Sequence, residues 1–256
     1  MDDLGPVVKS AAEGRPAAAG AIRSSGRAQA VLEVAVCSGF PTQLLLGAAL
    51  ATIGLRAMGD AGNLSFGYVV TLSLVDAVLV VGLIGFFLRA RGESLRELVL
   101  GGRSPRAEAR LGLLLVPALV AGVIAGTTLL GWVAPGLRNV PENPFESLLD
   151  TPGRVALFAI VAIVAGGIRE ELQRAFILRR FEQHLGGGWL GLVIFSTAFG
   201  LGHQIQGWDA AILTGLLGAG WGAMYLIRRS AVAPMVSHAG FNVAEILLAL
   251  AAAGSG

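Results

Sequence analysis

Long apolar runs alternate with short polar segments along most of this chain. Seven of the runs have about the 17–25 residues that a membrane-spanning helix needs. They lie at about residues 31–55, 66–88, 111–133, 155–178, 189–206, 210–227 and 231–253. Their apolar residues are continuous and do not alternate, so the pattern predicts helices and excludes a β-barrel. We therefore expect an all-α fold, a polytopic transmembrane bundle of about seven or eight helices.

The composition supports the same class of protein. Mean hydropathy is +0.71, and only 14% of the residues are charged, whereas soluble domains carry about 25%. A soluble fold of this size could not bury so much apolar surface. We see no internal repeat, so residues 29–256 are predicted to form a single transmembrane domain. Residues 1–28, rich in Ala, Gly, Ser and Arg, are predicted to be a disordered basic tail without a cleavable signal peptide.

Basic residues are distributed unevenly among the polar segments. Arg-rich loops follow the second, fourth and sixth runs, and the N-terminal tail is also basic. The other loops contain few basic residues. By the positive-inside rule, this alternation predicts a multi-pass protein of the cell (inner or plasma) membrane with a cytoplasmic N-terminus. The low Lys and high Arg and Ala content is typical of a GC-rich bacterial genome.

The fourth run ends in an unusual group of charges. Arg169, Glu170, Glu171 and Arg174 follow an apolar segment that is long enough to reach deep into a bilayer. A charge near the bilayer centre costs about 2.5–3.5 kcal/mol on insertion scales. A helix with these charges usually faces a polar cavity. The alternative is that the run ends at Ile168 and that the charges form an interfacial cap.

Two later runs contain histidines with a polar or aromatic residue four positions away. His203 follows Phe199 in the fifth run, and His238 precedes Asn242 in the seventh. Residues four apart share one helix face, so His238 and Asn242 can point into one cavity. Carboxylates can activate water, imidazoles can transfer protons, and an amide can stabilise an anion. Each residue alone could instead be a packing or hydrogen-bonding group, and only their combination favours chemistry.

Three other residues of the spans have simpler interpretations. Asp76 in the second run is either a functional carboxylate or a structural partner for a hydroxyl or Arg on a neighbouring helix. Pro41 is expected to kink the first run or to mark its start near Phe40. Cys37 is the only cysteine, which excludes an intrachain disulfide and a Cys-based zinc site.

The last two motifs resemble those of the CPBP family of intramembrane proteases, also called the Abi or CAAX-protease-like family. That family has a Glu pair followed by Arg, then FxxxH, then HxxxN, on three helices. The chain contains Phe199-Gly-Leu-Gly-His203 and His238-Ala-Gly-Phe-Asn242, in the same order and spacing. The resemblance covers about residues 155–245.

The first motif departs from the family pattern. The family has EExxxR, whereas this chain has Glu170-Glu171-Leu-Gln-Arg174, which is one residue short. Aligning the Glu pair puts Arg174 one place early. Aligning Arg174 instead puts Arg169 and Glu170 on the two family Glu positions, and a cation then replaces the main carboxylate. Glu170 is a Glu in both registers and is therefore our candidate for the residue that activates water.

The resemblance implies hydrolysis of a peptide bond within the membrane, in a cavity that faces the cytoplasm. Glu170 with His203 would deprotonate a water, and His238 with Asn242 would stabilise the oxyanion. Glu171 or Arg174 would orient the pair. Counting 1.5 Å per helical residue puts His203 toward the outer end of its span, away from Glu170 and His238. A tilted helix, or a fifth span that starts deeper, would be needed to bring them together.

The family has been described both as metal-dependent and as a glutamate protease. Two His and a Glu could bind zinc, but no HExxH motif is present, so we expect a metal-free site and assign no metal ligand and no firm cofactor. The expected partners are a membrane protein or peptide substrate and the lipid bilayer, and no nucleic acid.

Two other functions stay open. The protein could be a non-catalytic membrane scaffold or immunity-type protein that keeps the polar cluster for folding or binding. It could also be a small transporter or channel subunit, although many transporters contain an internal repeat that is not seen here.

Overall fold

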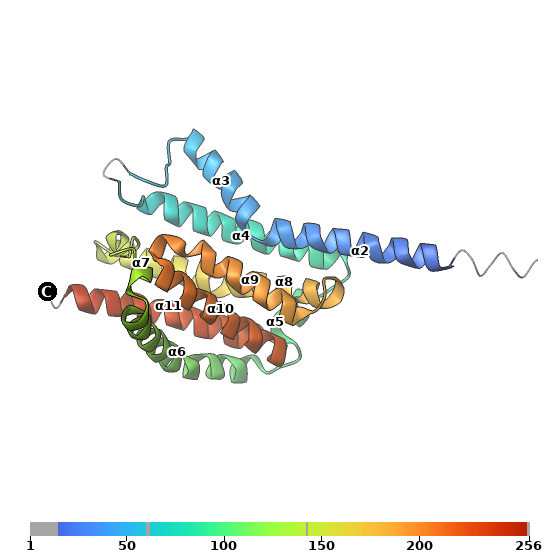
Figure 1. Ribbon diagram of the computed structural model, residues 1–256. Coiled ribbons are helices and arrows are strands. Elements are labelled where there is room, and N and C mark those ends of the chain that lie inside the picture. Colours follow the sequence, from blue (N-terminus) through green and yellow to red (C-terminus); the bar gives the residue numbers. More distant parts are fainter. Residues whose placement is uncertain (1–14, 60–61, 142, 255–256) are drawn as a thin grey trace, which may run out of the picture.

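The computed structural model describes residues 15–59, 62–141 and 143–254 of the chain, and these residues form a bundle of helices (Figure 1). The principal helices are α2 (Arg15–Cys37), α3 (Phe40–Thr52), α4 (Phe66–Ala90), α5 (Leu95–Leu100), α6 (Pro105–Val133), α7 (Pro152–Val161), α8 (Glu170–His184), α9 (Gly188–Gly202), α10 (Trp208–Arg228) and α11 (Val232–Ala253). A π-helical segment, η3 (Ala162–Arg169), joins α7 to α8. Three 3₁₀ turns complete the described helices: η1 (Pro135–Leu137), η2 (Glu146–Leu148) and η4 (Gln204–Gln206). The predicted all-α class is confirmed.

Helices α4, α6, α10 and α11 are each long and apolar enough to cross a membrane. Helices α2 and α3 meet that condition together, although the chain bends by 41° between them. α3 begins at Phe40, as Pro41 predicted, and Gly39 before it has the positive φ of 85° that the bend requires. The fourth predicted span is the broken helix α7–η3–α8, and the fifth is the short apolar helix α9.

The N-terminal tail differs in part from the prediction. α2 begins at Arg15, inside the segment that was expected to be disordered, and its first residues are rich in Ala and Arg, which are strong helix formers. Residues 1–14 of the predicted tail lie outside the described residues.

The long helices alternate in direction, so the connections between them gather at two ends of the bundle (Figure 1). One end holds α5 and the connections α4–α5, α5–α6, α8–α9 and α10–α11, and we call it the basic end. Its basic residues are Arg89, Arg91, Arg96, Arg103, Arg106, Arg110, Arg179, Arg180, Arg228 and Arg229. The opposite end, here the far end, holds the connections α3–α4, α6–α7 and α9–α10 together with the end of α11.

Buried ion pairs tie the helices together at the basic end. Glu33 of α2 is fully buried and pairs with Arg180 of α8 and, at 2.7 Å, with Arg91. Arg180 also reaches Glu93 at 2.6 Å. Removing one partner from a buried pair typically costs about 3–5 kcal/mol because the other charge is left uncompensated. These pairs therefore help to close the bundle at this end.

Candidate active site

The π-helix η3 leads directly into Glu170, the first residue of α8. A π-helix is wider than an α-helix, and short π segments occur frequently at functional sites. The widened backbone has a partner on α11, because the side-chain amide of Asn242 donates a hydrogen bond to the carbonyl oxygen of Ala162 at 3.1 Å. Asn242 therefore holds the broken helix against α11. Only one of its two amide N–H groups is used in this bond, and the other has no hydrogen-bond partner among the described residues.

Close approach of η3 to α11 depends on a glycine. A Cβ atom added at Gly167 would lie 2.8 Å from the Cα of Ala239 on α11, closer than real Cβ atoms come. Only glycine leaves this space free, so the sequence at this position allows the two backbones to meet.

We expect Gly167→Ala to lower the free energy of unfolding by about 1–3 kcal/mol, because overpacking forces the two backbones apart. Gly122→Ala on α6 is the matched control, since a Cβ at Gly122 would meet nothing within 4 Å. That control should be neutral or slightly stabilising, because Ala is the better helix former. Thermal unfolding in detergent measures both, and equal effects of the two changes would contradict the packing argument.

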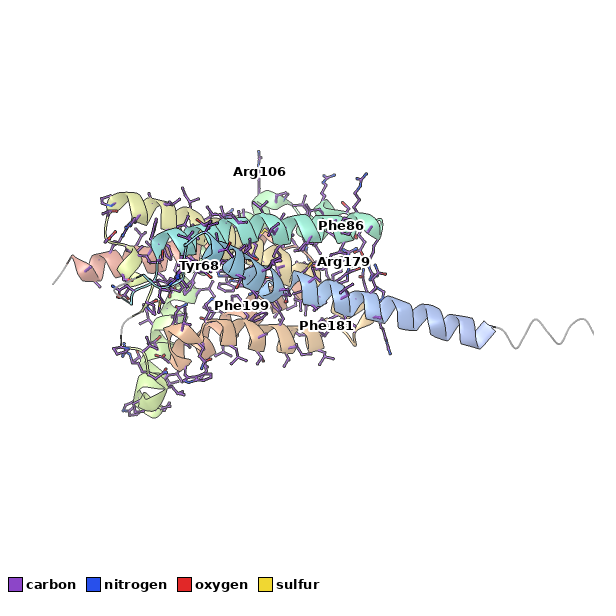
Figure 2. All side chains as sticks on the ribbon, turned by 90° about the horizontal axis from the view of Figure 1, so that it is seen from above. Tyr68, Phe86, Arg106, Arg179, Phe181 and Phe199 are labelled. Atoms are coloured by element: carbon purple, nitrogen blue, oxygen red, sulfur yellow. The ribbon has the colours of Figure 1, made fainter. Side chains whose placement is uncertain are left out.

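Glu171 is the buried member of the Glu pair. It forms an ion pair with Arg174, one turn further along α8. Its Oε1 accepts a hydrogen bond from Nδ1–H of His238 at 2.8 Å. Arg174 is fully buried, and its guanidinium lies 4.7 Å from the centre of the Phe199 ring. Figure 2 shows Phe199 among the helices of the bundle. Glu171 and Arg174 thus form a dry, charge-balanced support for His238.

Glu170 has a different environment from its neighbour. Its side chain is 20% exposed, and its Oε2 lies 3.9 Å from Nε2 of His238. This distance is too long for a direct hydrogen bond, but one water molecule can contact both atoms. The ring of His238 stacks on Trp221 with 3.8 Å between centroids. Trp221 is itself fixed, because its Nε1–H donates to Ser237 Oγ at 3.1 Å. His238 is therefore held rigidly between the two carboxylates.

Arg169 lies outside this arrangement. It pairs with Asp76 of α4 and donates to Gln173 Oε1 at 3.2 Å. Asp76 also accepts a hydrogen bond from the hydroxyl of Thr42. The structural interpretation of Asp76, as a partner for a hydroxyl and an Arg on neighbouring helices, is confirmed. Successive helical residues point about 100° apart, so the cation at Arg169 can face α4 while Glu170 faces α11.

His203 is set apart from the Glu pair. It follows the last residue of α9, and its Nδ1–H donates to the carbonyl oxygen of Phe199 at 2.8 Å. The Phe199 ring lies between the two imidazoles, 4.7 Å from His203 and 6.3 Å from His238. Among the described residues, no hydrogen bond or ion pair joins His203 to Glu170, Glu171 or His238. His203 therefore makes no direct polar contact with these three residues within the described part of the chain.

A cavity of about 640 Å³ brings four of the predicted residues together. Its lining includes Glu170, His203, His238 and Asn242. The lining does not include the other three predicted residues, Glu171, Arg174 and Phe199.

Sequence reasoning did not assign Trp221 or Glu245 to the site, although both line the cavity. The sequence could have indicated Glu245, because it follows His238 by seven residues and therefore lies on the same helix face. Trp221 had none, since only packing of α10 on α11 brings its ring to the imidazole.

The donors present do not form a metal site. Within residues 15–59, 62–141 and 143–254, no three His, Cys, Asp or Glu side chains are placed to hold a metal ion together. Nδ1 of His238 is already bonded to Glu171, and His203 lies beyond Phe199. The arrangement does not fit the zinc site that two His and a Glu could have formed.

The apolar helices and this polar cavity are typical of a membrane protein with a buried polar site. Residues 152–244 match the family described as type II CAAX prenyl endopeptidase Rce1-like. The match covers all three motifs and supports the resemblance to the CPBP, or CAAX-protease, family over this part of the chain. No curated protein and no solved structure shows a significant match to the chain.

Proposed function

We propose that the protein is an intramembrane endopeptidase in which Glu170 activates the attacking water. The observation that carries the proposal is a chain of neighbouring side chains, in which Glu170 lies next to His238, His238 contacts Glu171, and Glu171 pairs with Arg174. Of these four side chains, only Glu170 and His238 line the cavity. Family membership supports a protease of this type, and a peptide or protein substrate follows from it.

The proposed reaction begins with water held between Glu170 and Nε2 of His238. Glu170 takes a proton as the water oxygen bonds to the peptide carbonyl carbon. That proton passes to the leaving nitrogen as the C–N bond breaks, so the products are a carboxylic acid and an amine. A carboxylate next to an imidazole is a common base arrangement, and such proton transfer typically contributes about 10²–10⁴ to the rate. Glu171 fixes the His238 ring by accepting its Nδ1–H, as the orienting carboxylate of a hydrolase triad does.

Asn242 and His203 have supporting roles in this proposal. The N–H of Asn242 that remains free is suited to the oxyanion that forms on the carbonyl oxygen, because amide donors stabilise such charge. His203 donates its Nδ1–H to Phe199, which leaves Nε2 as a proton acceptor on the same cavity. In this proposal His203 serves as a second proton acceptor on the cavity wall and does not contact Glu170 directly.

The test is cleavage of a single-span reporter protein by the purified chain in lipid vesicles, followed by mass spectrometry. We expect the wild type to cut, and His238→Gln to cut about a hundredfold more slowly. His184→Gln is the matched control, because His184 ends α8 at the basic end and contacts Arg91 instead of the cavity. The control should cut at the wild-type rate.

Two outcomes would reject the proposal. One is cleavage by His238→Gln as fast as by the wild type. The other is reporter binding without any cleavage by the wild type, which would instead indicate the non-catalytic scaffold.

A further inference from the structure

The walls of the cavity come from one half of the bundle. α4 contributes Val69 and Ser73, close to its start, and α6 contributes Val123 and Thr127, close to its end. Both of these helix halves lie toward the far end. The remaining walls are the connection from α6 to α7, the region around η4, and the last turns of α11. Among the described residues, the connections of the basic end supply none of the lining.

The opposite side of the cavity is closed by packed side chains. Trp221, which lines the inner part of the cavity, is only 1% exposed. Beyond it toward the basic end, α8 carries a continuous stretch of buried residues from Glu171 to Leu178. Arg228 of α10 pairs with Glu108 of α6 at 2.6 Å. The cavity therefore has its entrance at the far end and its floor at Trp221 and His238.

The two ends of the bundle differ in charge. The basic end carries the ten arginines named above, whereas the described basic residues at the far end are Arg56, Arg138 and Arg154. The positive charge of Arg154 is balanced by its ion pair with Asp150. Loops rich in Arg stay in the cytoplasm because they resist transfer across the membrane. The charge pattern therefore assigns the basic end to the cytoplasm and the far end to the outside.

We propose that the site takes its substrate from the non-cytoplasmic face of the membrane. The entrance and the basic loops lie at opposite ends, which reverses the cytoplasm-facing cavity expected from the sequence. The orientation stands on geometry and charge, whereas the nature of the substrate rests on the proposed function. The substrate class is then a membrane-anchored protein with an extended segment just outside its anchor.

The depth of the site sets the length of that segment. Glu170 lies eighteen positions after Pro152, the residue that begins α7 at the far end. At about 1.5 Å per residue this is roughly 25 Å of helix. An extended chain covers about 3.3–3.6 Å per residue, so about seven or eight residues reach from the entrance to Glu170. A substrate that is folded up to its anchor cannot supply this stretch.

Cysteine labelling tests the orientation without any need for activity. The background is Cys37→Ala, which removes the only cysteine. Ser147→Cys then places one thiol at the far end, and Ser104→Cys places one at the basic end, both at exposed positions. In intact cells we expect a membrane-impermeant maleimide to label only the first, and to label the second once the membrane is disrupted. Labelling of Ser104→Cys in intact cells, alone or with Ser147→Cys, would overturn the proposal.

Two reporters extend the test to the substrate. They carry the same eight-residue stretch either just outside or just inside one membrane anchor. We expect only the outer version to be cut, and cleavage of only the inner version would overturn the proposal. If neither is cut while Ser147→Cys is labelled from outside, the proposed protease function fails and the orientation stands. The two failures are therefore distinguishable.

Discussion

Glu170→Gln is expected to abolish peptide-bond cleavage while the fold stays intact. Gln has almost the same shape as Glu, but its amide cannot take a proton from water. Loss of a general base typically lowers the rate by about 10²–10⁴. The fold should tolerate the change, because Glu170 is open to the cavity and makes no ion pair with an Arg among the described residues. The single-span reporter in lipid vesicles gives the rate, and thermal unfolding in detergent gives the stability.

Glu97→Gln is the matched control for this change. Glu97 lies on α5 at the basic end, its side chain is 64% exposed, and it is only a distant partner of Arg179. The same chemical substitution there should leave both cleavage and stability unchanged. If Glu170→Gln retained more than about a tenth of the wild-type rate, the general-base role would be wrong, because base catalysis is worth at least about a hundredfold.

Arg174→Met should have the largest effect on stability. It leaves the carboxylate of Glu171 buried without its cation, and breaking such a pair typically costs about 3–5 kcal/mol. His238 remains as the only hydrogen-bond donor to that carboxylate among the described residues. We therefore expect a large drop in the free energy of unfolding, measured by denaturation in detergent, with loss of cleavage as a consequence.

The double change Arg174→Met with Glu171→Met tests this explanation. It removes both charges, so the fold should regain much of the lost stability, as observed when buried pairs are replaced by apolar residues. Arg106→Met is the surface control, because Arg106 projects away from the bundle (Figure 2), and it should change stability by less than about 0.5 kcal/mol. A double variant no more stable than Arg174→Met would show that the charge of Glu171 is not the cause.

The register of the first motif shows how far local sequence could go. From the sequence, Arg169 was one of two candidates for the family's main Glu position. In the fold it pairs with Asp76 on α4, and the cavity receives Glu170 instead. The π-helix that ends at Arg169 changes the direction in which Arg169 and Glu170 face. The apolar sequence of residues 162–168 does not predict this π-helix. The missing residue of the motif and the widened helix thus occur side by side.

The roles of the two histidines were also beyond the sequence. His203 and His238 belong to equally clear motifs, and the family resemblance implied His203 as the partner of Glu170. Only the packing of α8 on α11 brings His238 within 3.9 Å of Glu170, while Phe199 keeps His203 apart. Local spacing defines which residues share a helix face, but it does not define which faces meet.

The sequence by itself determined that this is a helical membrane protein. It also identified the charged and polar residues within the apolar runs as the candidates for chemistry, because the bilayer strongly constrains where such residues occur. The tertiary structure decided which of those residues meet and which of the two Glu faces the cavity. These features depend on helix rotation and on contacts between residues far apart in the chain. Local periodicity contains no information about either.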